Sequence, residues 1–137
     1  MGMKYLWDPN IAIYYLQQQF PKMTELFVDD LVKESRIAIS AITEIELLCW
    51  KAAKESDLKV LNEFISDCFV IDLEQEIKLK TADIRKKYNI KLPDAIIAAT
   101  AMVYSLGLVT RNEKDFMQIE GLNIINPFNI KQSGPFY

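Results

Sequence analysis

The chain has 137 residues, half of them hydrophobic, and its 16 basic and 19 acidic side chains leave a net charge of -3. This size fits a single domain, residues 1–137, that can bury a hydrophobic core. Because the sequence contains no histidine, a Ser-His-Asp triad, a histidine acid–base pair and a zinc site with a histidine ligand are all excluded.

The N-terminal segment predicts a strand that ends at an acid. Residues 5–7 are apolar, and Asp8-Pro9-Asn10 breaks the strand before a helical stretch at residues 11–19. In an open parallel sheet, ligands bind beyond the carboxyl ends of the strands. Asp8 is therefore a candidate site residue, although a turn or a cap of the following helix would also explain it.

A helix at residues 23–34 and a strand at residues 36–40 are expected next, followed by a helix with two glutamates. At about 100° per residue, Glu46 falls in the middle of an apolar arc that includes Ile45, whereas Glu44 falls opposite. We therefore expect Glu46 to face inward and Glu44 to face water. An inward carboxylate needs a partner, which makes Glu46 a second candidate.

The middle of the chain predicts a helix at residues 58–67, a strand at 69–72 and a long helix at 74–87. Asp72 and Gln75 fit a capping box that opens this long helix. Cys49 and Cys68 lie in apolar contexts and are expected to be reduced, buried thiols of a cytoplasmic protein.

The most informative stretch is residues 92–116. Pro93 and Asp94 suit the first turn of a helix, since proline is tolerated there and carboxylates favour the positive end of the helix dipole. This helix is almost wholly apolar, so it should be buried, and Gly107 is expected to end it. A short strand around residues 108–109 follows, which places Asp115 just beyond its carboxyl end.

Simple structural interpretations of these last two acids stay open. Asn112 and Asp115 fit a capping box, and Asp94 can be explained by the helix dipole alone. However, such interpretations leave unexplained why Asp8, Glu46, Asp94 and Asp115 all fall at compatible ends of predicted elements.

The order of the elements predicts the fold class. A last strand is expected at residues 122–125 and an irregular tail at 128–137. Because strands alternate with helices along the chain, we expect an α/β sandwich with a mainly parallel sheet. The carboxyl ends of its strands would then bring the acids to one rim.

Converging carboxylates would need neutralisation. Two unit charges about 4 Å apart repel by roughly 4 kcal/mol at an effective dielectric near 20, and small domains are stable by only about 5–15 kcal/mol. Either protons are retained or a cation binds. Oxygen ligands suit Mg²⁺ or Mn²⁺, whose bound waters can become nucleophiles.

The spacing of these motifs resembles that of PIN domains, and more narrowly that of VapC-type toxin ribonucleases from bacterial and archaeal toxin–antitoxin modules. The matching blocks cover essentially the whole chain. They are Asp8, Ser40-Ala41-Ile42-Thr43 with Glu46-Leu47, Leu92-Pro93-Asp94-Ala95 with Ala98-Ala99, and Thr110-Arg111-Asn112 with Asp115-Phe116.

This resemblance implies a three-layer α/β/α fold and a metal-dependent endoribonuclease, in which a metal-activated water attacks an RNA phosphodiester. It also implies an antitoxin partner that covers the acidic groove, and a homodimer. The implied ligands of Mg²⁺ or Mn²⁺ are Asp8, Glu46, Asp94 and Asp115, with Asn10, Thr43, Thr110 and Asn112 as supporting residues. One departure is Pro9, which replaces the usual Thr or Ser and so removes a hydroxyl and a backbone donor beside Asp8.

The acidic net charge and the pI near 5.0 mean that contacts with RNA must be local. The candidates nearest the acids are Lys91, Arg111 and Lys114. A basic run at residues 85–87 lies further upstream and is better explained by the favourable placement of basic residues at the end of a helix.

Two other functions are compatible with the sequence. A receiver-like switch would be phosphorylated on Asp72, with Thr110 and Lys114 nearby, but it leaves Glu46 without a role. A PIN-like binding module without catalysis is suggested by Pro9.

No run of residues is long and apolar enough for a membrane span, and no signal peptide precedes Lys4. Residues 1–2 are interpreted as an addition ahead of a native Met3. These features add to the expectation of a cytoplasmic protein.

Overall fold

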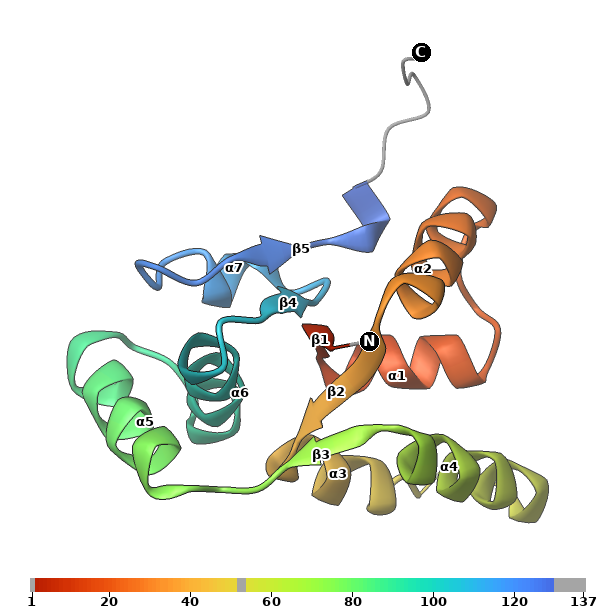
Figure 1. The fold of residues 1–137 in the computed structure, drawn as a ribbon, viewed down its shortest axis with the longest axis horizontal. Helices are drawn as coiled ribbons and strands as arrows, with labels where there is room; N and C mark the ends of the chain where they lie inside the picture. The colour runs from red at the N-terminus through yellow and green to blue at the C-terminus, as the bar shows by residue number, and fades with distance from the viewer. Residues whose placement is uncertain (1, 52–53, 130–137) are drawn as a thin grey trace.

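The structure is a computed structural model that describes residues 2–51 and 54–129, and this part of the chain contains one five-stranded sheet. The strands are β1 (Met3–Trp7), β2 (Arg36–Ser40), β3 (Phe69–Ile71), β4 (Gly107–Val109) and β5 (Ile124–Ile125). They lie in the order β3-β2-β1-β4-β5, and each of these pairings is parallel (Figure 1). The predicted parallel sheet is confirmed, and β1 lies at its centre.

Helices connect the strands and cover both faces of the sheet (Figure 1). They are α1 (Pro9–Leu16), α2 (Lys22–Glu34), α3 (Ala41–Leu48), α4 (Glu55–Asp67), α5 (Gln75–Lys87), α6 (Leu92–Val103) and α7 (Glu113–Phe116), with a 3-10 turn η1 (Pro127–Asn129) after β5. Helical crossovers are what parallel strands require, because a tight turn cannot join them.

Neighbouring residues of each strand point to opposite faces, so the strands contribute to two hydrophobic cores. Leu6 and Leu108 pack with side chains from α5, α6 and α7. Trp7 and Val109 pack on the other face with side chains from α1, α2 and α4. The three-layer α/β/α sandwich that the resemblance implied is therefore present.

Helix α6 is buried, as its apolar sequence predicted. Its buried residues are Ala95, Ile97, Ala98, Ala99, Thr100 and Ala101, and the Thr100 hydroxyl is satisfied by donating to the carbonyl of Ile96 at 2.7 Å. The helix leads into the amino end of β4, so its first turn lies at the carboxyl ends of the strands. Burial of α6 thus fixes Asp94 at the same rim as Asp8.

Gly107 does not end α6, contrary to our prediction. The helix ends at Val103, and Ser105 takes the left-handed backbone conformation with φ of 55°. Gly107 instead begins β4, where a Cβ would lie 2.8 Å from Ile125 Cδ1 and 3.3 Å from Tyr5 Cδ1. A larger residue here would require the Ile125 side chain and the Tyr5 ring to shift, because side chains from both neighbouring strands approach the backbone.

The predicted capping box at Asp72 is also wrong. Helix α5 begins at Gln75 with Glu74 as its N-cap, and no side chain in the described residues caps it. The chain turns after β3, where the Glu74 N–H donates to the carbonyl of Asp72 at 2.9 Å. Asp72 is therefore left exposed with its carboxylate free of this role.

The two cysteines differ in exposure. Cys68 is buried as predicted, but Cys49 is exposed, and both thiols are free. Residues 128–129 belong to η1 rather than to an irregular tail, and the rest of the predicted tail, 130–137, lies outside the described residues. Within the described ranges, no helix has the length and hydropathy to cross a bilayer.

Candidate functional site

Asp8 lies at the carboxyl end of the central strand, where it is only 6% exposed. Its Oδ1 accepts a 2.9 Å hydrogen bond from the backbone N–H of Asn10, and its Oδ2 accepts a 2.7 Å bond from the Thr110 hydroxyl. Asp8 therefore caps α1, as the simpler interpretation predicted, but only one of its oxygens does so. The other is held by the end of β4.

Pro9 does not deprive Asp8 of a backbone donor. It occupies the first position of α1, where a free N–H would have no partner within the helix. The next N–H, of Asn10, reaches Asp8 instead, and the Thr110 hydroxyl supplies an O–H donor. The carboxylate thus keeps both kinds of partner despite the departure at this position.

A chain of hydrogen bonds links Asp8 to Asp115 through Thr110 and Asn112. The Thr110 Oγ1 accepts from the Asn112 N–H at 3.0 Å, and Asn112 Nδ2 donates to Asp115 Oδ2 at 3.1 Å. Asn112 also caps α7, since its Oδ1 accepts from the Asp115 N–H at 3.4 Å. The predicted capping box is therefore half formed: the Asp115 carboxylate receives the side-chain amide of Asn112 rather than its backbone N–H.

Asp94 lies in the first turn of α6 and is half buried. Burial raises its pKa, the charges of Asp8 and Asp115 raise it further, and Lys91 lowers it. Asp8 and Asp115 therefore both lie within electrostatic reach of this carboxylate. Burial is also the main reason that the pKa of Asp8 is raised, and the donors Asn10 and Thr110 oppose that increase.

Glu46 does not face inward, so our prediction from the helical arc is wrong. The buried side chains of α3 are Thr43 and Leu47, while Ile45 is 54% exposed and Glu46 is exposed. The helix is short and buries one narrow line of side chains rather than the wider arc we expected. Partial burial of the carboxylate and the charges of Asp8 and Asp94 nevertheless raise the pKa of Glu46, so Glu46 lies within electrostatic reach of both acids.

Thr43 is held by the start of α3. The Ser40 hydroxyl accepts from the Thr43 N–H at 3.1 Å and donates to Thr43 Oγ1 at 3.0 Å. Both residues are completely buried. Thr43 therefore fixes the helix that carries Glu46, and the hydrogen bonds found for it in the structure do not include one to an acid.

The acids are linked through Asp8 and Asp94. Glu46 interacts with both of them, and Asp115 interacts with Asp94. Among the described residues, however, no three metal-ligating side chains are close enough together to hold one ion at once. This all-oxygen set of donors fits Mg²⁺ or Mn²⁺ held by one or two carboxylates with water filling the remaining positions.

Two pockets flank the acids. One, of about 330 Å³, is lined by Asp8, Asn10, Tyr14, Arg111 and Asn112. The other, of about 320 Å³, is lined by Arg85, Asn89, Ile90, Lys91 and Asp115. Arg111, Lys91 and Lys114 are all exposed. Arg111 lines the first of these pockets and Lys91 the second.

Sequence reasoning missed Tyr14. Its hydroxyl accepts a 3.3 Å hydrogen bond from Arg111, and its ring lines the same pocket as Asp8. The available signal was helical spacing, because Tyr14 follows the predicted supporting residue Asn10 by four positions and so shares its helix face.

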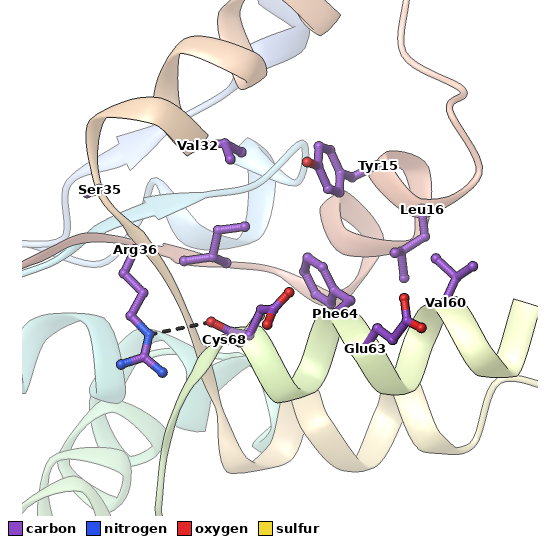
Figure 2. A pocket seen from close by; sticks show the side chains of 11 residues that line it. Tyr15, Leu16, Val32, Ser35, Arg36, Val60, Glu63, Phe64 and Cys68 are labelled. Carbon is purple, nitrogen blue, oxygen red and sulfur yellow. Dashed lines mark hydrogen bonds between the residues drawn. The ribbon is translucent and has the colours of Figure 1, made fainter. Parts of the chain in front are cut away.

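A different pocket, of about 400 Å³, lies away from the acids, between α1, α2, α4 and the start of β2 (Figure 2). Apolar side chains from α1 and α4, Leu16, Val60 and Phe64, line it together with Arg36 and Glu63. None of the four candidate acids contributes to it, so it is separate from the site described above.

Comparison with known proteins places the chain in a family. A family model described as PIN domain matches residues 5–122. The tRNA(fMet)-specific endonuclease VapC of Salmonella typhimurium is 31% identical over 89% of this chain and 96% of its own length. Ribonuclease VapC2 of Rickettsia felis is 30% identical over 90% and 98%.

Comparison of the fold with solved structures supports the same family. A solved toxin-antitoxin complex from Klebsiella pneumoniae contains a chain that superposes with a TM-score of 0.73 and 30% identity, and the match covers 93% of this chain and all of that one. The chain therefore belongs to the PIN domain family, and within it to the VapC-like proteins.

Proposed function

We propose that this protein is a metal-dependent endoribonuclease and the toxin of a toxin–antitoxin module. The observation that carries the proposal is the buried carboxylate of Asp8, which is fixed through both oxygens and lies within electrostatic reach of Glu46 and Asp94. The names of the Salmonella and Rickettsia relatives support an RNA substrate. The Klebsiella complex supports the antitoxin partner.

The acidic side chains have different proposed roles, which follow from their surroundings. Asp8, held by Thr110 and Asn10, and Asp94 would hold the ion, with Asp115 fixed beside them by Asn112. Glu46 is exposed and lies within electrostatic reach of Asp8 and Asp94, so its carboxylate can accept a proton from an attacking water as a general base. When bound, Mg²⁺ or Mn²⁺ supplies an activated water and offsets the charge that develops on the phosphate.

The receiver-like alternative fits the sheet poorly. Asp72 follows β3, the edge strand, whereas Thr110 follows β4, and both β2 and β1 lie between them. Thr110 is also engaged with Asp8. The non-catalytic alternative rested on Pro9, and the donors that Asp8 retains weaken that argument.

The proposed partners follow from the same site. An antitoxin segment that covers the acids would block RNA, so equimolar antitoxin should abolish cleavage. A homodimer is proposed through exposed apolar side chains such as Ile45 and Leu48 on α3, which are 54% and 57% exposed. Light scattering of the free toxin tests the dimer. RNA as substrate also implies action in the cytoplasm.

Cleavage of labelled tRNA by the purified protein tests the proposed activity. The assay compares Mg²⁺, Mn²⁺ and EDTA, and compares wild type with Asp94→Asn and with Asp72→Asn as a matched control. We expect cleavage with either ion, loss of it in EDTA and in Asp94→Asn, and full activity in Asp72→Asn. Equal RNA loss with wild type and Asp94→Asn would contradict the proposal, and phosphorylation of Asp72 by acetyl phosphate would favour the switch.

A further inference from the structure

Arg111 is held in a fixed position next to the acidic cluster. Its guanidinium carbon lies 4.3 Å from the centre of the Phe128 ring and 6.0 Å from that of Tyr14. Its Nη1 also donates a 3.3 Å hydrogen bond to the Tyr14 hydroxyl. Arginine stacks on aromatic faces in this way, and the attraction to the ring adds to the packing.

The aromatic side chains that hold Arg111 support one another. The ring centres of Tyr14 and Phe128 are 5.4 Å apart, and Phe20 packs against both at 6.1 and 5.7 Å. The three rings come from α1, the segment before α2, and η1. Because they join three separate segments, they restrain Arg111 before any ligand arrives, which lowers the entropy lost on binding.

Arg111 forms no ion pair with a carboxylate of residues 2–51 or 54–129. In the described part of the chain the ion pairs are Lys4–Glu34 and Lys22–Glu25, and Arg111 belongs to neither. Yet it lines one pocket with Asp8. The stacking holds the guanidinium in the pocket while leaving its charge available to an anion.

We propose that this pocket, lined by Asp8, Asn10, Tyr14, Arg111 and Asn112, binds an RNA phosphate adjacent to the one that is cleaved. Arg111 donates to its two non-bridging oxygens, and Phe128 and Tyr14 are positioning residues that orient the guanidinium. The inference rests on the proposed ribonuclease function and adds a substrate subsite to it. It also explains how a chain of net charge -3 attracts RNA towards a cluster of acids.

Arginine and lysine should differ at this position. A guanidinium presents a planar fork that matches two phosphate oxygens and stacks on Phe128, whereas an ammonium is a point charge on a flexible stem. We therefore expect Arg111→Lys to keep the charge attraction to the RNA phosphate and to lose the paired hydrogen bonds to its two oxygens. Arg111→Ala should lose both.

Binding of a fluorescent single-stranded RNA, followed by anisotropy in EDTA and in an Asp94→Asn background, tests this without relying on cleavage. We expect Arg111→Ala to weaken binding about 10-fold, as for one charged hydrogen-bonded contact. The slope of log K against log salt should fall by about 0.7, the value for one phosphate contact with a single strand. Arg111→Lys and Phe128→Leu should weaken binding while leaving that slope unchanged.

Arg36 provides the matched control. It is also exposed, and its guanidinium carbon lies 5.6 Å from the centre of the Phe69 ring. Its Nε donates to the Asp67 carbonyl at 3.4 Å, the hydrogen bond drawn from Arg36 in Figure 2. It begins β2 and so lies at the opposite end of the sheet from the acids. Arg36→Ala removes the same charge and should leave both affinity and salt slope unchanged.

Several results would overturn the inference. One is that Arg111→Ala leaves both the RNA affinity and the salt slope unchanged. Another is that Arg36→Ala loses as much RNA affinity as Arg111→Ala, and a third is that the Asp94→Asn protein binds no RNA. Circular dichroism establishes that each variant is folded. If Asp94→Asn cleaves RNA as fast as wild type, the proposed function fails, and the anisotropy measurement still decides the subsite independently. In the active protein, Arg111→Ala should raise KM more than it lowers kcat.

Discussion

The Thr110 hydroxyl donates a 2.7 Å hydrogen bond to Oδ2 of Asp8 across 102 residues of sequence. The Thr110 Oγ1 also accepts from the Asn112 N–H, so Thr110 connects the first acid to the segment that carries the last. We expect Thr110→Val, which keeps the shape and removes the hydroxyl, to lower cleavage by about 10- to 100-fold, as for other residues that orient ligands.

Thr110→Ser is the control for that prediction, because it retains the hydroxyl. Cleavage should stay within a few-fold of wild type in Thr110→Ser. When the cleavage rate is titrated with Mg²⁺, only Thr110→Val should need a higher Mg²⁺ concentration to reach half its maximal rate. If both variants behave alike, the hydroxyl does not orient Asp8.

Asp94 should destabilise the metal-free protein. Burial and the charges of Asp8 and Asp115 raise its folded pKa above the unfolded value of 3.8, so the folded chain binds the proton more tightly. Stability therefore falls as pH rises from the unfolded pKa through the folded one. In EDTA at pH 7, Asp94→Asn should be more stable than wild type by roughly 0.5–2 kcal/mol, and the gain should shrink as the pH is lowered towards about 4.

Urea unfolding with and without Mg²⁺ measures this effect. Saturating ion stabilises a protein by about 2.7 kcal/mol at 100 times Kd, and we expect most of that gain in wild type and little in Asp94→Asn. A variant that is less stable than wild type in EDTA at pH 7 would rule out charge repulsion at this site.

Glu46 and Glu44 form a matched pair on α3. Partial burial of the carboxylate and then the charges of Asp8 and Asp94 raise the pKa of Glu46. Glu46 is exposed, whereas Glu44 is half buried on another face of the helix. Glu46→Gln should lower kcat by about 10²–10⁴-fold, the range for loss of a general base, while Glu44→Gln should leave it unchanged. Single-turnover cleavage across pH distinguishes the two, and the reverse order of effects would show that Glu46 was assigned wrongly.

A side chain at Gly107 should destabilise the sheet. In Gly107→Ala the new Cβ would meet Ile125 Cδ1 at 2.8 Å and Tyr5 Cδ1 at 3.3 Å, so we expect a loss of about 1–3 kcal/mol from overpacking. Ile125→Val removes the nearer atom, and the double variant should recover part of the loss in urea unfolding. Strictly additive effects would indicate that the contact with Ile125 is not the cause.

The cysteines should react at very different rates. Burial raises the pKa of the Cys68 thiol to about 12, whereas Cys49 is exposed. Because the thiolate is the reactive form, a disulfide reagent at pH 8 should modify one thiol per folded chain, and Cys49→Ser should remove that reaction. Both thiols should react in denaturant. Rapid modification of Cys68 in the folded protein would contradict its burial.

Much of the fold follows from local patterns in the sequence. Strong signals, such as the apolar run of α6 and the turn at Asp8, predicted the alternating strands and helices and hence the parallel sheet. The rim shared by Asp8 and Asp115 follows from that topology alone, since β1 and β4 are neighbours. The family resemblance added the three-layer arrangement.

The predictions that failed depended on tertiary contacts. Helical spacing cannot decide which line of a short helix is covered, so Glu46 was placed inward when Thr43 and Leu47 are the buried residues. Gly107 looked like a helix end because its true reason, the approach of β1 and β5, is not local. The position of Arg111 depends on Phe128 and Tyr14, which are distant from it in sequence. The catalytic roles of the acids stay predictions.

Among the described strands the central one is synthesised first, and the residue that donates to Asp8 follows β4, near the end of the described chain. A nascent polypeptide that stops before Thr110 therefore contains Asp8 without its buried donor, and it lacks Asp115 altogether. Under the proposed function, a fragment released by early termination would lack part of the acidic cluster. The proposed activity would then arise only after translation has passed the segment that carries Thr110 and Asp115.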